Sequence, residues 1–499
     1  PKFPRPSGFN FLLRFYNRSG DKEALNMVSK TLLFMSKGGI YDHLGGGFHR
    51  YSVDRYWRVP HFEKMLYDQA QLAITYTEAF QITNDKFFAG VAADILSYVS
   101  KKLTDKGGGF YSAEDAESAV DPSKPRDKEE GAFYVWEKAE IEKLFGQKNS
   151  DIFCFYYGIG ERGNAPAGSD PHNVLINKNI LYVDRSLSET ANKFNKSTDE
   201  IYKIITESKK ILLENREKRP LPHLDDKILV SWNGLMISAF LKAYQVFNDS
   251  TYLNSARRSA DFILANLYDP ITNTLLHRFR DGEAKFEGTL DDYAFFTQGL
   301  LDLYESSFED KYLDLAVRLT GSMIQIFYDN ENGGFFDVSG KDKSILIRTK
   351  EEYDSAEPTG NSIAIMNLLR VSHFTDNQEL FDKAYKSLLY FSAKMSQQPY
   401  AMPQMLCALD YFLHNPKQII ISGDRTSSLT KEMIREVHKR FLPGKILIFA
   451  NGSTENKLIP FLSNIVSKSD KTTAYVCENY TCKLPARDIS EFKKQLDDK

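Results

Sequence analysis

Acid–base side chains are concentrated near the start of the chain. Three histidines and four acids fall between positions 42 and 68: Asp42, His43, His49, Asp54, His61, Glu63 and Asp68. A group of titratable side chains like this one can supply the acid and the base of a reaction near neutral pH. We therefore predict His43, His49, His61 and Asp68 as catalytic residues, and Asp42 and Glu63 as substrate-binding residues.

The same stretch is rich in aromatic rings and glycines. Trp57 and Tyr67 lie on either side of His61, and glycines 45–47 permit a tight turn. Such rings can stack on the apolar faces of sugars, although packing between helices is an equally good interpretation. The glycine run lacks the GKS/T ending of a phosphate loop, and the histidines lack HExxH spacing. We therefore expect neither a metal ion nor a cofactor.

Further polar segments precede predicted helices. They are "GGGFYSAEDAES", "ILVSWNGLMI", "GTLDDYAFFT" and "EPTGNSIAIM". From them we predict Glu114, Asp291 and Asp292 as catalytic residues. The predicted substrate-binding residues, besides those above, are Trp57, Tyr67, Asp115, Trp232, Asn233, Tyr293, Glu357 and Asn361. A simpler interpretation stays open, in which Asp292 forms a capping box with Thr289 and Thr359 is a helix N-cap.

A repeated pair of helices would position these segments. Residues 65–103, 231–267, 290–327 and 359–395 each read as a helix, a short polar turn and a second helix. The gap between Asp68 and Asn233 leaves room for two less regular pairs, and weaker helical segments are expected there at 135–145 and around 199–217. With helices at 23–37 and 403–413, the count approaches twelve. Such pairs bury their apolar faces only by stacking, which would bring the polar helix starts to one side.

The pattern changes near residue 416. Strands are expected at 417–423, 445–452 and 472–479, with helices at 429–442 and 488–499. The predicted fold is therefore mainly α, an (α/α)6 toroid of helical hairpins over residues 1–415 with a small α/β domain over 416–499.

Composition narrows the class of protein. The net charge of −3 argues against nucleic-acid and anionic-membrane partners, and no apolar run is long enough to span a bilayer. Cys154 and Cys407 lie in apolar settings, typical of core packing. For Cys477 and Cys482 we favour free thiols over a redox pair, because C-x4-C lacks the C-x-x-C spacing. These features favour a reducing, cytoplasmic environment.

Several motifs resemble one family along nearly the whole chain. "FLLRFYNRSGD", "GGIYDHLGGGFHRYSVDRYWRVPHFEKMLYDQAQL", "LDDYAFFTQGLLDLYE", "SAEPTGNS" and "YVCENYTCKLP" closely resemble the spermatogenesis-associated thioredoxin-domain family. The resemblance implies an (α/α)6 toroid similar to those of N-acylglucosamine 2-epimerases, cellobiose epimerases and several glycosidases. It also implies a thioredoxin-like domain, and this chain begins at the linker that follows that domain in the family.

Three kinds of function are compatible with these patterns. The first is a carbohydrate-active enzyme with a sugar or sugar-like substrate in a central funnel, using either epimerase-like or glycosidase-like acid–base chemistry. The second is a non-catalytic binding or scaffold module that acts with a thioredoxin-like domain or partner in redox or protein quality control. A sugar-binding ring without turnover is a third possibility.

Overall fold

The computed structural model describes residues 1–170, 173–451, 456–466, 471–478 and 481–498. Six helices form a closed inner ring, in which each helix packs against the next and the last packs against the first. They are α1 (Pro6–Ser19), α3 (Leu66–Thr83), α9 (Val230–Phe247), α11 (Leu290–Ser307), α13 (Gly360–Thr375) and α15 (Pro403–Leu413). Within the described residues, five outer helices return the chain: α2 (Lys22–Lys37), α4 (Lys86–Lys102), α10 (Ser250–Asn266), α12 (Asp310–Phe327) and α14 (Gln378–Gln397). The predicted (α/α)6 toroid is confirmed.

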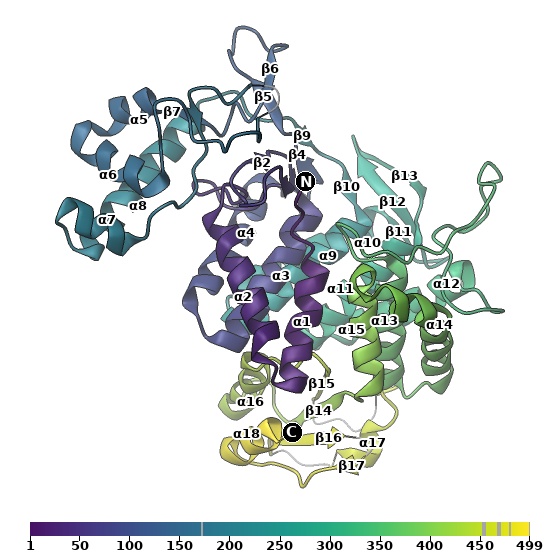
Figure 1. The fold of residues 1–499 in the computed structure, drawn as a ribbon. Coiled ribbons are helices and arrows are strands. Elements are labelled where there is room, and N and C mark those ends of the chain that lie inside the picture. Colours follow the sequence, from purple (N-terminus) through teal and green to yellow (C-terminus); the bar gives the residue numbers. More distant parts are fainter. Residues whose placement is uncertain (171–172, 452–455, 467–470, 479–480, 499) are drawn as a thin grey trace.

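Short turns join each inner helix to its outer partner at one end of the ring. The inner helix ends in a left-handed residue, such as Asn84 or Asn248, and the next residue, Asp85 or Asp249, caps the outer helix through its side chain. All the long connections therefore lie at the other end, where the inner helices begin (Figure 1).

Three of these long connections contain a glycine-rich turn that ends in phenylalanine. The carboxamide of Gln69 accepts from the backbone N–H of Phe48 and donates to its carbonyl, at 2.8 Å in both cases. Asn233 clamps Phe110 in the same way, and Asn361 clamps Phe335. Each carboxamide pairs backbone groups that would otherwise be buried without a partner. The clamps therefore attach each turn to the inner helix that follows it.

Short strands complete the end of the ring where the long connections lie. They are β1 (Tyr51–Ser52), β2 (Pro60–His61), β3 (Lys64–Met65), β4 (Ala113–Glu114), β9 (Leu224–Asp225), β10 (Ile228–Leu229), β11 (Tyr268–Asp269), β12 (Thr274–Arg280) and β13 (Glu283–Glu287), with a 3-10 turn at Pro399–Ala401. Strand β4 pairs with both β3 and β9, which connects the starts of α3 and α9.

The long connection between α4 and α9 forms a side lobe rather than two further hairpins of the ring. Its helices pack on one another around a separate hydrophobic core. The elements are β5 (Glu117–Ala119), β6 (Lys128–Glu130), β7 (Trp136–Glu137), α5 (Lys138–Phe145), α6 (Gln147–Tyr157), β8 (Lys178–Asn179), α7 (Leu187–Phe194) and α8 (Thr198–Arg216). The sequence predicted the helices near α5 and α8, but the ring is completed by α1 and α15 instead.

The C-terminal part is a small mixed sheet with helices, as predicted. Strand β14 (Lys417–Ser422) is parallel to β15 (Lys445–Ala450) and antiparallel to β16 (Thr473–Glu478), which pairs with β17 (Thr481–Cys482). The helices are α16 (Ser428–Lys439), α17 (Leu462–Ile465) and α18 (Ile489–Asp497). Gly452, Asn479 and Lys499, at the ends of predicted elements, lie outside the described residues. This part lies at the end of the ring that has the short turns (Figure 1).

Two of the four cysteines are free, and the other two form a disulfide. Cys154 and Cys407 are buried and free, which confirms the prediction for them. Cys477 and Cys482 form a disulfide, so the interpretation of two free thiols was wrong. They face each other across the pairing of β16 with β17, with their Cα atoms 3.9 Å apart, a proximity that sequence spacing alone does not show. In the described parts of the chain, no helix is long and apolar enough to cross a membrane.

Candidate functional site

Acidic and aromatic side chains from four segments meet where the inner helices begin. Asp68 is in the first turn of α3 and Asp291 in that of α11, Trp232 is near the start of α9, and Glu357 lies just before α13. We call the following residues the helix-start cluster: Arg50, Glu63, Tyr67, Asp68, Trp232, Asp291 and Glu357. All but Arg50 were predicted as site residues.

Asp68 is the most deeply buried acid of the cluster. Only 2% of the residue is exposed, and its Oδ2 atom has no hydrogen-bond partner among the described residues. Burial raises the pKa of this carboxyl well above its usual range; Arg50 opposes the rise, and repulsion from Glu357 and Glu63 adds to it. The positive end of the helix dipole favours the ionised form by only about 0.3–1 kcal/mol. Asp68 therefore keeps its proton to a higher pH than an ordinary aspartate does.

Glu357 and Asp291 are acids that repel each other. Burial, together with repulsion from Glu351, raises the pKa of Glu357 to about 7, although hydrogen bonding by Trp232 opposes the rise. Burial and then repulsion from Glu357 raise the pKa of Asp291 well above its usual range. A Cβ atom on Gly360 would lie 2.3 Å from Asp291 Oδ1, so a larger residue there would displace this carboxyl. These contacts bring Asp291 against the start of α13.

Two aromatic rings and two hydrogen bonds hold the cluster together. The rings of Tyr67 and Trp232 meet edge to face, with their centroids 4.9 Å apart. Arg50 Nη1 donates to Glu63 Oε2 at 2.9 Å. Gln71 Nε2 donates to the carbonyl of Ala356 at 2.8 Å, which ties the segment before α13 to α3.

His61 lies at the edge of the cluster. Its Nδ1 atom is 2.7 Å from Glu130 Oε1, and its Nε2 atom is 3.8 Å from Glu63 Oε2. Hydrogen bonding to Glu130 raises the pKa of the half-buried imidazole, against an opposing effect of burial. His61 is therefore more readily protonated than a free histidine, and it reaches the cluster through Glu63.

The other two predicted histidines are buried in structural contacts. His43 Nε2 lies 2.9 Å from the carbonyl of Gly38, and His49 Nδ1 lies 2.9 Å from that of Phe62. Burial lowers the pKa of His43 to about 4 and that of His49 to about 3, so both are neutral near pH 7. The structure does not bring either of them into the cluster, because backbone carbonyls of their own loop hold them.

Asp42 is also structural. Its carboxylate accepts from both Nη atoms of Arg216 and from Lys64 Nζ, each at 2.8 Å. Burial opposes ionisation, yet Arg216 and Lys64 together hold the pKa of Asp42 well below its usual range. This buried ion triad joins the loop before α3 to helix α8 of the side lobe.

Asp292 has a role as a cap and a connector. It forms the capping box with Thr289, accepts from the N–H of Ser231 at 3.0 Å, and lies 2.8 Å from His277 Nδ1. Thr359 caps α13 through the N–H of Ser362. The simpler capping interpretations are therefore confirmed. Asp292 is fully buried, but it acts electrostatically on both Glu357 and Asp291.

The remaining predicted residues have other surroundings. Asn233 and Asn361 are the clamps described above, and Tyr293 accepts from the N–H of Leu275 through its hydroxyl. Glu114 accepts from the hydroxyl of Tyr98 at 2.6 Å, and the N–H of Asp115 donates to the carbonyl of His223. Trp57 lies beneath Lys2, which is 4.0 Å from the ring centroid, in a different cavity.

Sequence reasoning missed three groups near the cluster. Arg50 directly follows His49 in the stretch that drew attention, but only acids, histidines and aromatic residues were selected there. His277 lies in a strand that carried no motif. Glu351 belongs to the acidic run before Thr359, a composition signal that could have been used. Within the described residues, no three His, Cys, Asp or Glu side chains are arranged to hold a metal ion.

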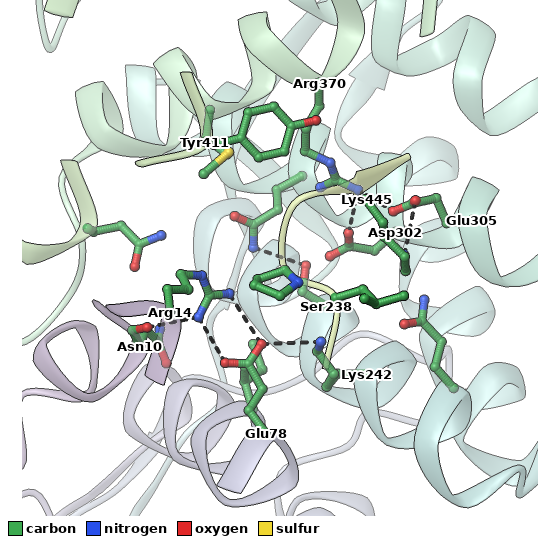
Figure 2. A pocket seen from close by; sticks show the side chains of 17 residues that line it. Asn10, Arg14, Glu78, Ser238, Lys242, Asp302, Glu305, Arg370, Tyr411 and Lys445 are labelled. Carbon is green, nitrogen blue, oxygen red and sulfur yellow. Dashed lines mark hydrogen bonds and ion pairs between the residues drawn. The ribbon is translucent and has the colours of Figure 1, made fainter. Parts of the chain in front are cut away.

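A second polar region lies inside the ring, and Figure 2 shows the side chains that line it. Side chains from all six inner helices and from the segment entering β15 line a cavity of about 170 Å³. Glu78 pairs with Arg14 and Lys242, while Glu305 pairs with Arg370 and Lys445. Glu78 is ten residues beyond Asp68 on α3, which is about 15 Å along the helix. This region is an internal ion-pair network that binds the C-terminal part to the ring.

Comparison with known proteins identifies the family. A human protein named spermatogenesis-associated protein 20 is 38% identical over 99% of this chain, and an uncharacterised protein of Caenorhabditis elegans is 36% identical over 99% of it. The chain belongs to the spermatogenesis-associated protein 20 family. It spans 66% of the human relative and 70% of the nematode relative. No family model matches the chain.

Two solved structures with a loosely similar fold are named as sugar enzymes. Cellobiose 2-epimerase from Bacillus thermoamylovorans has a TM-score of 0.49 at 10% identity, over 78% of this chain and 75% of that one. The GH76 α-mannanase BT2949 of Bacteroides thetaiotaomicron has a TM-score of 0.45 at 13% identity, over 78% and 73%. The likeness is distant, and the fold assignment comes from the closed ring itself.

Proposed function

We propose that the helix-start cluster is the acid–base site of an enzyme that acts on a carbohydrate. The observation that carries the proposal is the group of acids Asp68, Asp291 and Glu357, whose pKa values all lie above their usual range. Acids and bases catalyse best when their pKa lies near the working pH, and displaced values of this kind gather at functional sites. The pKa of about 7 for Glu357 fits this role.

The roles follow from the surroundings of each side chain. Asp68, which has a raised pKa and an Oδ2 atom without a hydrogen-bond partner among the described residues, would donate a proton to a leaving or carbonyl oxygen. Glu357 would take up and return a proton near pH 7, and Asp291 would contact substrate hydroxyls. Tyr67 and Trp232 would present an aromatic surface to a sugar ring, as such rings do through their apolar faces.

Carboxyl chemistry fits these residues better than histidine chemistry. His43 and His49 are buried and held by backbone carbonyls, which leaves His61 at the edge of the cluster. Pairs of carboxyl groups serve as acid and base in most glycosidases. The proposed reaction is therefore glycosidase-like, with epimerisation as the second candidate. A thioredoxin-like partner and a cytoplasmic location stay predictions.

The charge of the cluster restricts the substrate class. Four acids surround one arginine, and three of the four already have a raised pKa. A carboxylate-bearing sugar would add to the repulsion among them. We therefore expect neutral sugars and amino sugars to bind, and uronic acids to bind more weakly.

A glycoside and sugar screen with two variants tests the proposal. On a substrate found in the screen, Asp68→Asn and Glu357→Gln should each lose about 10²- to 10⁴-fold in kcat. Glu352→Gln is the matched control, because Glu352 lies in the same segment but pairs with Lys394. In the wild type, a plot of kcat/KM against pH should show a transition near pH 7, and Glu357→Gln should abolish this transition. Full activity of both variants would refute the assignment, and sugar binding without turnover would favour the binding-module alternative.

A further inference from the structure

A second cavity, outside the ring, has a different charge. It has a volume of about 500 Å³, within the usual range for small-molecule sites. Its walls come from the start of the chain, the last turns of α2, residues 55–58 and residues 182–184. Five cations line it, Lys2, Lys30, Lys37, Arg55 and Arg58, against one carboxylate, Asp184. We call it the basic cavity.

Little within the described chain neutralises these cations. Lys30 and Lys37 are exposed and form no salt bridge in the part of the chain that the structure describes. Asp184 lies 3.5 Å from Arg58 and is shared with Arg185 at 2.7 Å. The nearby carboxylate of Asp54 accepts from the backbone N–H groups of residues 56, 58 and 59, and of the five cations it acts electrostatically on Lys2. The cavity therefore keeps a positive field.

Some aromatic rings of the cavity lie against its cations, and two rings also have exposed surface. Lys2 Nζ lies 4.0 Å from the ring centroid of Trp57, and the guanidinium of Arg58 lies 4.6 Å from that of Tyr182. Two further rings on the lining are about half exposed, Phe34 at 53% and Tyr56 at 50%. The guanidinium of Arg55 lies 4.7 Å from the ring centroid of Tyr56, so one face of that ring already carries a cation. Exposed rings beside fixed cations can bind a flat group that carries negative charge.

The local backbone is built to hold this arrangement. Trp57 has a left-handed backbone, with φ of 67°, which is costly for a bulky residue. A Cβ atom on Gly38 would lie 2.2 Å from the carbonyl oxygen of Trp57, so the loop packs closely only against glycine. The N–H of Val183 donates to the carbonyl of Lys37 at 2.7 Å and brings Tyr182 beside α2. Three segments far apart in sequence thus converge on the cavity.

We propose that the basic cavity binds a nucleoside phosphate, with its phosphates on the lysines and arginines and its base against Tyr56 and Phe34. The size of the cavity, its excess of cations and the pair of exposed rings each contribute to this inference. A sugar phosphate or inorganic phosphate would use the same cations but would leave the rings unused. The inference does not rest on the function proposed for the helix-start cluster.

Binding measurements with charge-matched variants test the inference. Isothermal titration of the whole chain with ATP, AMP, adenosine, glucose 6-phosphate and inorganic phosphate should give the tightest binding for ATP, and affinity should fall as salt is added. The double variant Lys30→Glu/Lys37→Glu should weaken ATP binding by at least about tenfold, since each cation contacts or attracts the phosphates. Tyr56→Ala should weaken ATP but leave inorganic phosphate unchanged.

A charge-matched control variant tests whether ATP binding depends only on net charge. Lys22→Glu/Lys101→Glu changes the net charge by the same amount at exposed lysines outside the cavity, and it should leave ATP binding unchanged. Equal losses in the two double variants would show that ATP responds only to net charge and would overturn the inference. So would inorganic phosphate binding as tightly as ATP, or no binding of ATP at about 1 mM.

Discussion

Glu357→Gln should stabilise the protein at alkaline pH and not at acidic pH. Burial and acidic neighbours move the pKa of Glu357 from its ordinary 4.5 to about 7. Between these two values the folded protein holds a proton that the unfolded chain has released, so its free energy of unfolding falls as pH rises through this window. Each factor of ten in proton affinity is about 1.4 kcal/mol, which makes the full penalty about 3 kcal/mol above pH 7.

Glutamine has nearly the same shape and no proton to lose, so it avoids this penalty. The assay is urea unfolding of the wild type and of Glu357→Gln at about pH 4.5 and about pH 8, followed by tryptophan fluorescence. We expect a gain of about 3 kcal/mol for the variant at the higher pH and almost none at the lower pH.

A matched control separates this effect from the general loss of a negative charge. Glu352→Gln removes an acid of the same segment that forms a partly exposed pair with Lys394 at 3.0 Å, and it should change stability by less than about 1 kcal/mol at either pH. If Glu357→Gln gained equally at both pH values, or lost stability at pH 8, the reasoning about a buried, repelled carboxyl would be refuted.

Three further predictions concern the framework around the cluster. Asp42→Asn leaves Arg216 and Lys64 buried without their carboxylate and should lower the free energy of unfolding by about 3–5 kcal/mol, measured by urea unfolding; a loss below 1 kcal/mol would contradict the importance of the triad. Asn233→Ala removes the clamp on Phe110 and should cost about 2–4 kcal/mol in the same measurement, whereas a neutral result would mean that water replaces the carboxamide. Cys477→Ser/Cys482→Ser opens a very short loop, so chain entropy limits the loss in the free energy of unfolding to about 2 kcal/mol. A larger loss, measured by urea unfolding against the disulfide-containing protein, would contradict this reasoning.

Much of the fold could be predicted from the sequence because its signals are local. Helical periodicity marked the inner and outer helices except α1, and short polar turns separated the two helices of each pair. The side lobe was not predicted, since a helix that joins the ring and one that packs outside it have the same periodicity. Ring membership depends on contacts between α15 and α1, which are distant in sequence.

The candidate site was predicted only in part, for a different physical reason. Neighbouring residues in a loop or helix can point in opposite directions, so sequence proximity does not show which ones meet. Trp232 contacts Tyr67, while the adjacent Asn233 clamps Phe110. His61 reaches the cluster, while His49, from the same loop, is buried against the carbonyl of Phe62. Composition identified the loop, but only the packing shows which of its side chains belong to the helix-start cluster and which make structural contacts.

The clamp between Asn233 and Phe110 has a consequence for how this architecture can change. It joins two points that are 123 residues apart in sequence, and the whole side lobe lies between them. Closing a flexible loop becomes costlier by only about 0.6 kcal/mol for each doubling of its length. Segments can therefore be lengthened or shortened between these two points at little cost in closure entropy while Trp232 keeps its place, as long as Arg216 still pairs with Asp42 and Glu130 with His61.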